Sequence, residues 1–208
     1  QLALYRKKYG KLWKSYMSSN GNQYVDKDLR VNGSINLSNK LIIKKYPAFS
    51  AYQSTSVDEQ SLATATWTRI QIDTENYDNG SNFDITNFKF TAPYNGIYHF
   101  DAKILLDGNA DTDAGDFDAE ERLDVALFKN QGSATTTSTT KRMASSLHLV
   151  AGAITDSVLE GRLSTDLELN TGDYIELFAY QNSGVEQHTF SNAVDDWTRF
   201  TGHLVCAL

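Results

Sequence analysis

The chain has 208 residues, which is enough for one all-β domain plus an extension, and its aromatic content of 12% favours strands. A single cysteine, Cys206, excludes a disulfide within one chain and a cysteine-based zinc site. No apolar run approaches the roughly 18 residues of a membrane helix, so no membrane insertion is expected.

The formal net charge of −7 is divided unevenly along the chain. Residues 1–45 carry ten Lys or Arg against two Asp, or +8, whereas residues 46–208 carry −15. A basic arm on an acidic body indicates contact with nucleic acid, a membrane surface or an acidic partner. The alternative is a solvated stalk whose lysines only keep it soluble.

Residues 1–23 are predicted to form a helical anchor arm. Apolar residues from 2 to 16 are spaced 3, 4, 3, 4, which is the a/d seam of a coiled coil. Two heptads do not form a stable isolated helix, so the helix expected over residues 2–17 must pack on copies of itself or on a partner. The residues assigned to anchoring and trimer contacts are Leu2, Tyr5, Tyr9, Leu12, Trp13 and Tyr16.

Residues 24–46 are predicted to form a β-structured stalk. The apolar residues change here to period two, and Asn32-Gly33 is a hairpin signal. One such face is too small a core for a single chain, but three chains around an axis bury it. The run DLRVNGSINLSNKL resembles the β-repeats in the shafts of bacteriophage tail and head fibres.

Residues 47–208 are predicted to form an all-β head domain. About eight to ten short runs of aromatic and β-branched residues are separated by turn signals, with no convincing helical pattern. This arrangement favours a jelly-roll β-sandwich.

Four motifs in the head resemble, in order, the globular head of complement's first component, subcomponent q, and its tumour-necrosis-factor-like relatives. They are PAFSAY at 47–52, FKFTAPYNGIYHFDAKI at 88–104, LNTGDYIELFAY at 169–180 and FTGHLV at 200–205. The resemblance implies a jelly roll that assembles as a homotrimer. The chain lacks a collagen repeat before the head, which argues against a collagen-linked complement or hormone role.

Glycine and proline in these motifs have structural interpretations. Pro93 ends a strand, since it lacks an N–H and has a fixed φ. Gly96 and Gly172 suit turns that need positive φ, and Gly202 suits a close backbone approach in the last strand.

No catalytic motif is present, so the protein is not expected to be an enzyme or to need a cofactor. The histidines at 99, 148, 188 and 203 stand singly in or beside strand patterns, and satisfied or exposed strand histidines are the simpler interpretation. There is no nucleophile elbow, phosphate-binding glycine loop or zinc-binding helix motif.

One acidic segment partly imitates a calcium loop. Asp107, Asn109, Asp111 and Asp113 place oxygen ligands at alternate residues. Thr112 stands where such a loop needs glycine, and small acidic residues also describe a plain surface loop. Calcium is therefore the one cofactor that the sequence suggests.

Two further segments combine aromatic and polar residues in a way that suits glycan or protein contacts. They are assigned as recognition loops around Tyr77, Asp78 and Asn79 and around Trp197. The same aromatics are equally suited to capping the core.

Two functional hypotheses follow. The first is a trimeric virion structural protein, a head or tail fibre or capsid decoration, whose arm docks on a capsid or tail protein and whose head mediates adhesion to a host-surface glycan or protein. The second is a secreted, extracellular ligand or glycan-binding recognition protein. Nucleic acid is the weaker partner for the arm, because the acidic head repels a polyanion.

The calcium hypothesis has a direct test. If the loop holds calcium, binding to the folded state raises the melting temperature as calcium is added, and chelation reverses the rise. An unchanged melting temperature up to millimolar calcium identifies the segment as solvated surface.

Overall fold

A computed structural model describes residues 2–8, 11–17, 23–25, 46–54, 60–107, 120–150, 158–190 and 196–208. The chain divides into two compact units, Gln1–Ile43 and Lys44–Leu208. Every regular element among the described residues is a β-strand.

The first unit contains a small antiparallel sheet in place of the predicted helix. Its strands are β1 (Leu2–Lys8), β2 (Lys11–Met17) and β3 (Gln23–Val25), in the order β1-β2-β3. Lys8 pairs with Lys11, so β1 and β2 are consecutive antiparallel strands.

The helix predicted over residues 2–17 is therefore wrong, and two competing preferences explain the error. Gly10 inside a helix costs about 1 kcal/mol relative to alanine, and the Tyr and Trp residues of this segment prefer strands. The coiled-coil seam is lost with the helix. Residues 26–45, which include most of the predicted stalk, lie outside the described residues.

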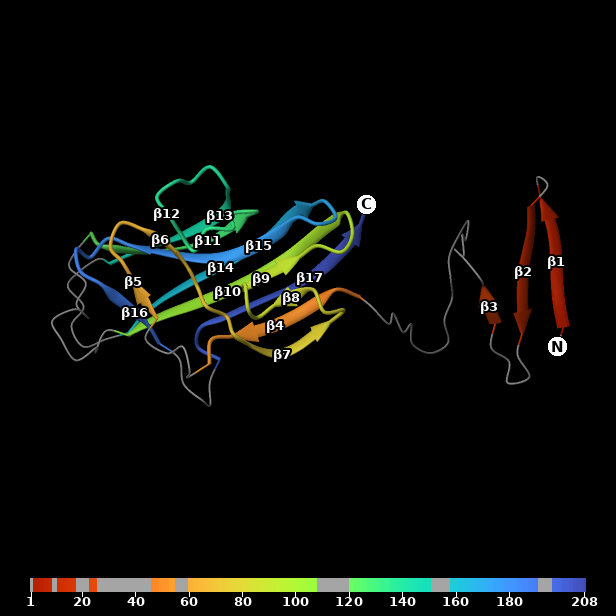
Figure 1. The fold of residues 1–208 in the computed structure, drawn as a ribbon, viewed down its shortest axis with the longest axis horizontal. Coiled ribbons are helices and arrows are strands. Elements are labelled where there is room, and N and C mark those ends of the chain that lie inside the picture. The colour runs from red at the N-terminus through yellow and green to blue at the C-terminus, as the bar shows by residue number, and fades with distance from the viewer. Residues whose placement is uncertain are drawn as a thin grey trace. The chain divides into compact units, whose positions relative to one another are not determined.

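The second unit is a sandwich of two antiparallel seven-stranded sheets (Figure 1). Sheet I has the order β5-β16-β10-β17-β4-β7, and β14 pairs with β10; sheet II has the order β12-β6-β15-β11-β13, with β9 on β15 and β8 on β9. The strands are β4 (Ala48–Tyr52), β5 (Ser61–Leu62), β6 (Trp67–Arg69), β7 (Thr74–Asn79), β8 (Phe83–Asp84), β9 (Lys89–Thr91), β10 (Gly96–Asp107), β11 (Arg122–Lys129), β12 (Thr135–Thr136), β13 (Arg142–Leu149), β14 (Leu159–Leu169), β15 (Tyr174–Gln181), β16 (Gln187–Thr189) and β17 (Arg199–Ala207).

Aromatic rings fill the space between the two sheets. Phe49 on β4 lies 5.1 Å from Phe90 on β9 and 5.0 Å from Phe200 on β17, measured between ring centroids, and all three side chains are fully buried. Each such burial contributes roughly 1.5–3 kcal/mol. Period-two alternation along β10 directs Tyr98, Phe100 and neighbouring apolar residues inward, and directs the intervening residues to the outer face.

A buried ion pair orders one end of sheet II. Arg69 Nη1 lies 2.8 Å from Glu176 Oε1, and the Glu176 side chain is fully buried. The other carboxylate oxygen accepts hydrogen bonds from the backbone N–H groups of Gln131 and Gly132, both at 3.1 Å. Glu176 therefore ties the turn after β11 to strands β6 and β15, and its charge is satisfied structurally.

The motif glycines have three outcomes. Gly202 is closely approached, but by aromatic side chains and not by the backbone that was predicted: a Cβ built there would lie 2.6 Å from a Phe100 ring carbon and 2.8 Å from a Phe49 ring carbon. Gly172 has the predicted positive φ, of 89°. The positive φ predicted for Gly96 is wrong, because Gly96 begins strand β10. A side chain is excluded there for lack of space: a Cβ would lie 2.6 Å from the Cys206 carbonyl oxygen.

Gly202→Ala should destabilise the head by about 2–3 kcal/mol, because the added methyl overpacks two rings that have no room to shift. The melting temperature is expected to fall by roughly 5–10 °C, measured by calorimetry. Adding Phe100→Leu should recover part of the loss. Thr201→Ala, on the opposite face of the same strand, is the control, and an equal loss in that variant would contradict the packing explanation.

Candidate functional site

The polar outer face of sheet I is the candidate site. β10 pairs with β14 on one side and with β17 on the other, so its outward residues meet a partner on each flank. The three cross-strand rows are Asp166–His99–His203, Ser164–Asp101–Thr201 and Arg162–Lys103–Arg199. We call the first the histidine row and the last the cation row.

His99 is held between two carboxylates. Its Nδ1 lies 2.6 Å from Asp166 Oδ1, and its Nε2 lies 3.0 Å from Asp101 Oδ2. The Ser164 Oγ is 3.4 Å from the same Nε2, and the His203 ring centroid lies 5.4 Å from that of His99. The histidines at 99 and 203 are thus neighbours, which corrects the interpretation that they stand singly.

These contacts favour the protonated imidazole. The hydrogen bond to Asp166 raises the pKa of His99 above its ordinary value, burial opposes that effect, and the charge of Asp101 adds to it. Ser164, His99 and Asp166 resemble a hydrolytic triad in composition only. A general base must be free to accept a proton, but the imidazolium has both nitrogens donating to carboxylates.

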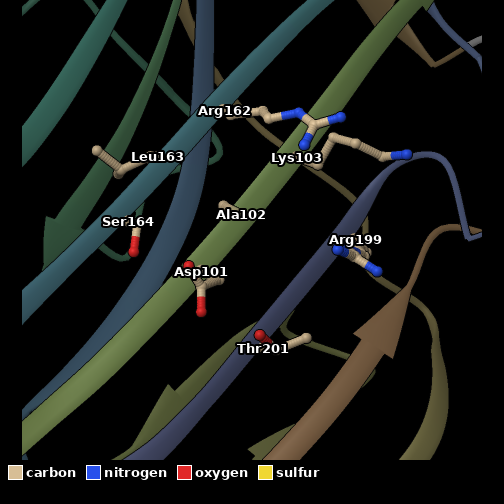
Figure 2. Close-up of a pocket in the computed structure, with 8 residues that line it drawn as sticks. All are labelled: Asp101, Ala102, Lys103, Arg162, Leu163, Ser164, Arg199 and Thr201. Carbon is tan, nitrogen blue, oxygen red and sulfur yellow. The ribbon is translucent and has the colours of Figure 1, made fainter.

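A hollow of about 670 Å³ lies beside the histidine row (Figure 2). The cation row borders one end, and Asp101, Ser164 and Thr201 border the other. Cationic side chains, two hydroxyl groups and the Asp101 carboxylate therefore border one open concavity.

The predicted recognition residues are in the described structure, but most have structural roles. Asp78 Oδ2 accepts a hydrogen bond from the Phe83 backbone N–H at 2.8 Å, and Asn79 Nδ2 donates to the Tyr46 carbonyl oxygen at 2.6 Å. All three residues 77–79 belong to strand β7 and do not form a loop. Only Tyr77, 56% exposed, offers its ring to solvent.

Trp197 also packs on the molecule itself, with its ring centroid 4.7 Å from that of Phe190. Its half-buried side chain is consistent with the alternative that these aromatics cap the core.

The other predicted sites are outside the part of the chain whose side chains are described. Of the calcium candidates, Asp107 ends strand β10, whereas Asn109, Asp111 and Asp113 lie outside the described residues. Among the described residues no group of three or more acidic, histidine or cysteine side chains could hold a metal ion. Of the anchoring residues, Tyr9 lies outside the described residues and Leu2, Tyr5, Leu12, Trp13 and Tyr16 lie in β1 and β2.

The histidine row and the cation row were not predicted from the sequence, because the three residues of each row come from three different strands. The available signal was the alternation in three segments, HFDAK, GRLSTD and RFTGH, each of which places polar residues at every second position. Pairing those segments needed the order β14-β10-β17, which joins strands distant in the chain.

Comparison of the folded chain with solved structures identifies the architecture. Eiger TNF from S. frugiperda superposes with a TM-score of 0.53 at 9% sequence identity, over 79% of this chain and 95% of that one. The head is a C1q/TNF-like jelly roll. The globular domain of zebrafish complement 1qA protein is also similar, with 16% sequence identity and a TM-score of 0.49 over 78% of this chain and 99% of that one. Murine APRIL is similar with 11% identity and a TM-score of 0.48, over 76% of this chain and 97% of that one. No protein-family model and no curated protein matches the sequence.

The motifs behind the predicted resemblance occupy central strands of this C1q/TNF-like head. They fall on β4, on β9 with β10, on β15 and on β17. Five of their aromatic residues belong to the core between the sheets, so these positions report the fold and not a ligand: Phe49, Phe90, Tyr98, Phe100 and Phe200. No helix among the described residues has the length and apolar character to span a membrane.

The histidine row predicts a pH dependence of stability. A raised folded-state pKa contributes stability that is complete below the ordinary value of 6.5 and is lost as the pH rises through the folded pKa. The difference in melting temperature between wild type and Asp166→Asn should therefore be largest below the ordinary value of 6.5 and shrink as the pH rises through the folded-state pKa of His99. Glu168→Gln, an exposed carboxylate on the same strand, is the control. A pH-independent difference would show that the pair does not set the His99 charge.

Proposed function

We propose that the chain is a trimeric recognition module in which a C1q/TNF-like head is displayed on a basic arm. The observation that carries the trimer is an apolar stripe on strand β13. The exposed fractions of Met143, Leu147 and Leu149 are 43%, 58% and 60%, and these residues share one parity along the strand. Val158, just before β14, is 51% exposed.

The position of the stripe supports association with another copy. β13 is the last strand in the order of sheet II, so one side of the strand has no partner within that sheet. An apolar edge strand left in water promotes association with another chain. A contact of this edge with a different surface of the next copy is heterologous, and such contacts form a closed ring when the rotation between copies is a simple fraction of a full turn. The family resemblance implies three copies.

For the biological setting we propose display on a virion surface as a fibre or capsid decoration. The contrast between residues 1–45, at +8, and residues 46–208, at −15, supports separate tasks for the two parts. The arm docks on a capsid or tail protein through its basic residues, and the head carries adhesion. Because the arm contains a β-hairpin, docking of an amphipathic helix in a groove is not part of this proposal.

The second candidate is a secreted or extracellular ligand, which the structural similarity to an insect TNF favours. In both candidates the head binds and does not catalyse, an interpretation supported by the doubly hydrogen-bonded His99. The neighbouring genes discriminate the two candidates: capsid and tail genes favour the first, and a secretion signal encoded upstream favours the second. Calcium binding by the segment from Asp107 to Asp113 remains a proposal.

The trimer is tested by replacing Leu147 and Leu149 together with lysine. Three copies are expected for the wild-type chain in sedimentation equilibrium at micromolar concentration. The variant should dissociate, because charges on the stripe cannot be buried without partners. Val185→Lys, at an exposed apolar residue elsewhere on the head, is the matched control and should remain trimeric. A monomeric wild type, or an unaffected double variant, would contradict the proposed interface.

A further inference from the structure

A histidine side chain joins the edges of the two sheets. β13 is the last strand in the order of sheet II, and among the described strands β14 pairs with β10 alone. The backbone N–H of Arg162 on β14 donates a hydrogen bond to Nε2 of His148 on β13, at 2.9 Å. A side chain of one edge strand therefore satisfies a main-chain donor of the other, which water or another strand would otherwise bind.

The contact is closely packed. A Cβ built at Gly161 would lie 3.2 Å from Cδ2 of His148 and 2.5 Å from Cγ2 of Val125, so the absence of a side chain lets β14 approach this closely. Ser146 Oγ lies 3.1 Å from the same Nε2, and the imidazole is partly buried. We call His148, Gly161 and Arg162 the edge seam.

The hydrogen bond to Arg162 requires that Nε2 of His148 carries no proton. A backbone N–H can only donate, so the nitrogen that faces it must offer its lone pair. A protonated imidazole has an N–H on both nitrogens, and its Nε2–H would face the Arg162 N–H. The Arg162 carbonyl oxygen, 3.2 Å from Nε2, can accept that proton, but the backbone N–H then loses its partner.

Charged groups of both signs lie around the edge seam. Burial raises the pKa of the Asp124 carboxyl, and the hydrogen bond from Arg162 lowers the pKa of the Glu160 carboxyl. Both carboxylates attract an imidazolium, whereas the arginines repel it. The N–H of Arg162 is in direct contact with the ring, so the hydrogen bond sets the charge state that the closed seam needs. The charged groups in question are Asp124 and Arg122 on β11, Arg142 on β13, Glu160 and Arg162 on β14, and Lys103 on β10.

The edge seam adjoins the apolar stripe. Leu147 and Leu149 flank His148 directly on β13, and the alternation of a strand places them on its opposite face. A change in how β13 is held against β14 therefore changes the position or mobility of the stripe.

We propose that His148 is a pH-sensitive latch that holds β13, with its apolar stripe, against β14. The neutral ring accepts the Arg162 N–H and closes the edge seam, and the protonated ring releases it. Histidine ordinarily changes charge between pH 5 and 8, so the contribution of the bond is present at the upper end of that range and is lost as the pH falls. This sign is opposite to that of His99, whose contribution is lost as the pH rises.

The latch has a consequence for assembly that rests on the proposed trimer. Because the stripe is the proposed contact between copies, opening of the edge seam in acid should weaken the association of the chain.

The latch is tested by hydrogen exchange at the Arg162 amide of the full chain, at about pH 7.5 and about pH 5.5. After correction for the intrinsic pH dependence of exchange, protection should be about 3- to 10-fold lower at the acid pH, as expected for the loss of one hydrogen bond. In His148→Gln protection should be equal at both pH values, because the amide oxygen accepts an N–H in either condition.

His188→Gln, at a partly buried histidine of strand β16, is the matched control and should behave like wild type. Protection in wild type that does not fall in acid, or that falls equally in His148→Gln, would overturn the latch.

Sedimentation equilibrium of the same three proteins tests the consequence for assembly. Association of wild type should be at least about threefold weaker at the acid pH, and that of His148→Gln should change less. A wild-type trimer whose association does not depend on pH would overturn the link between the latch and assembly. A wild type that is monomeric at about pH 7.5 would contradict the proposed trimer, and the amide exchange would still decide the latch.

Discussion

The structure depends on the close contact between the aromatic rings of β4, β9, β10 and β17. Phe100 and Phe200 are stacked with ring centroids 5.7 Å apart, and Gly202 leaves room for Phe100 and Phe49. Because these inward residues determine which side of each strand faces the core, they also determine which residues reach the outer face. The histidine row and the cation row are a consequence of that alternation.

This dependence explains why the fold was predictable from the sequence. The motifs around Phe49, Phe100 and Phe200 combine period-two alternation with turn residues, and local and long-range preferences agree in them. The arm shows the opposite case. Its apolar residues fit a helical period, but Gly10 disfavours a helix and the abundant aromatics favour strands, so periodicity alone predicted the wrong element.

The candidate site was less predictable than the fold. His99, Asp166 and His203 are far apart in the chain, and only the strand order brings them together. The segments that looked like recognition loops contain Asp78, Asn79 and Trp197, whose polar and aromatic groups are used within the fold. Composition could not separate these two uses, because a side chain suited to bind a ligand is equally suited to bind its own backbone.

Two exposed features of the head differ in their chemistry. The edge of sheet II has an apolar stripe on β13, which only another protein surface can cover. The outer face of sheet I has a charged hollow with cationic and hydroxyl donors.

The most direct test of the trimeric account is a crystal structure of the full chain. We expect three copies around one axis, with Met143, Leu147 and Leu149 of each copy buried against the next. A head whose β13 stripe faces solvent, in a crystal without a threefold assembly, would contradict the account.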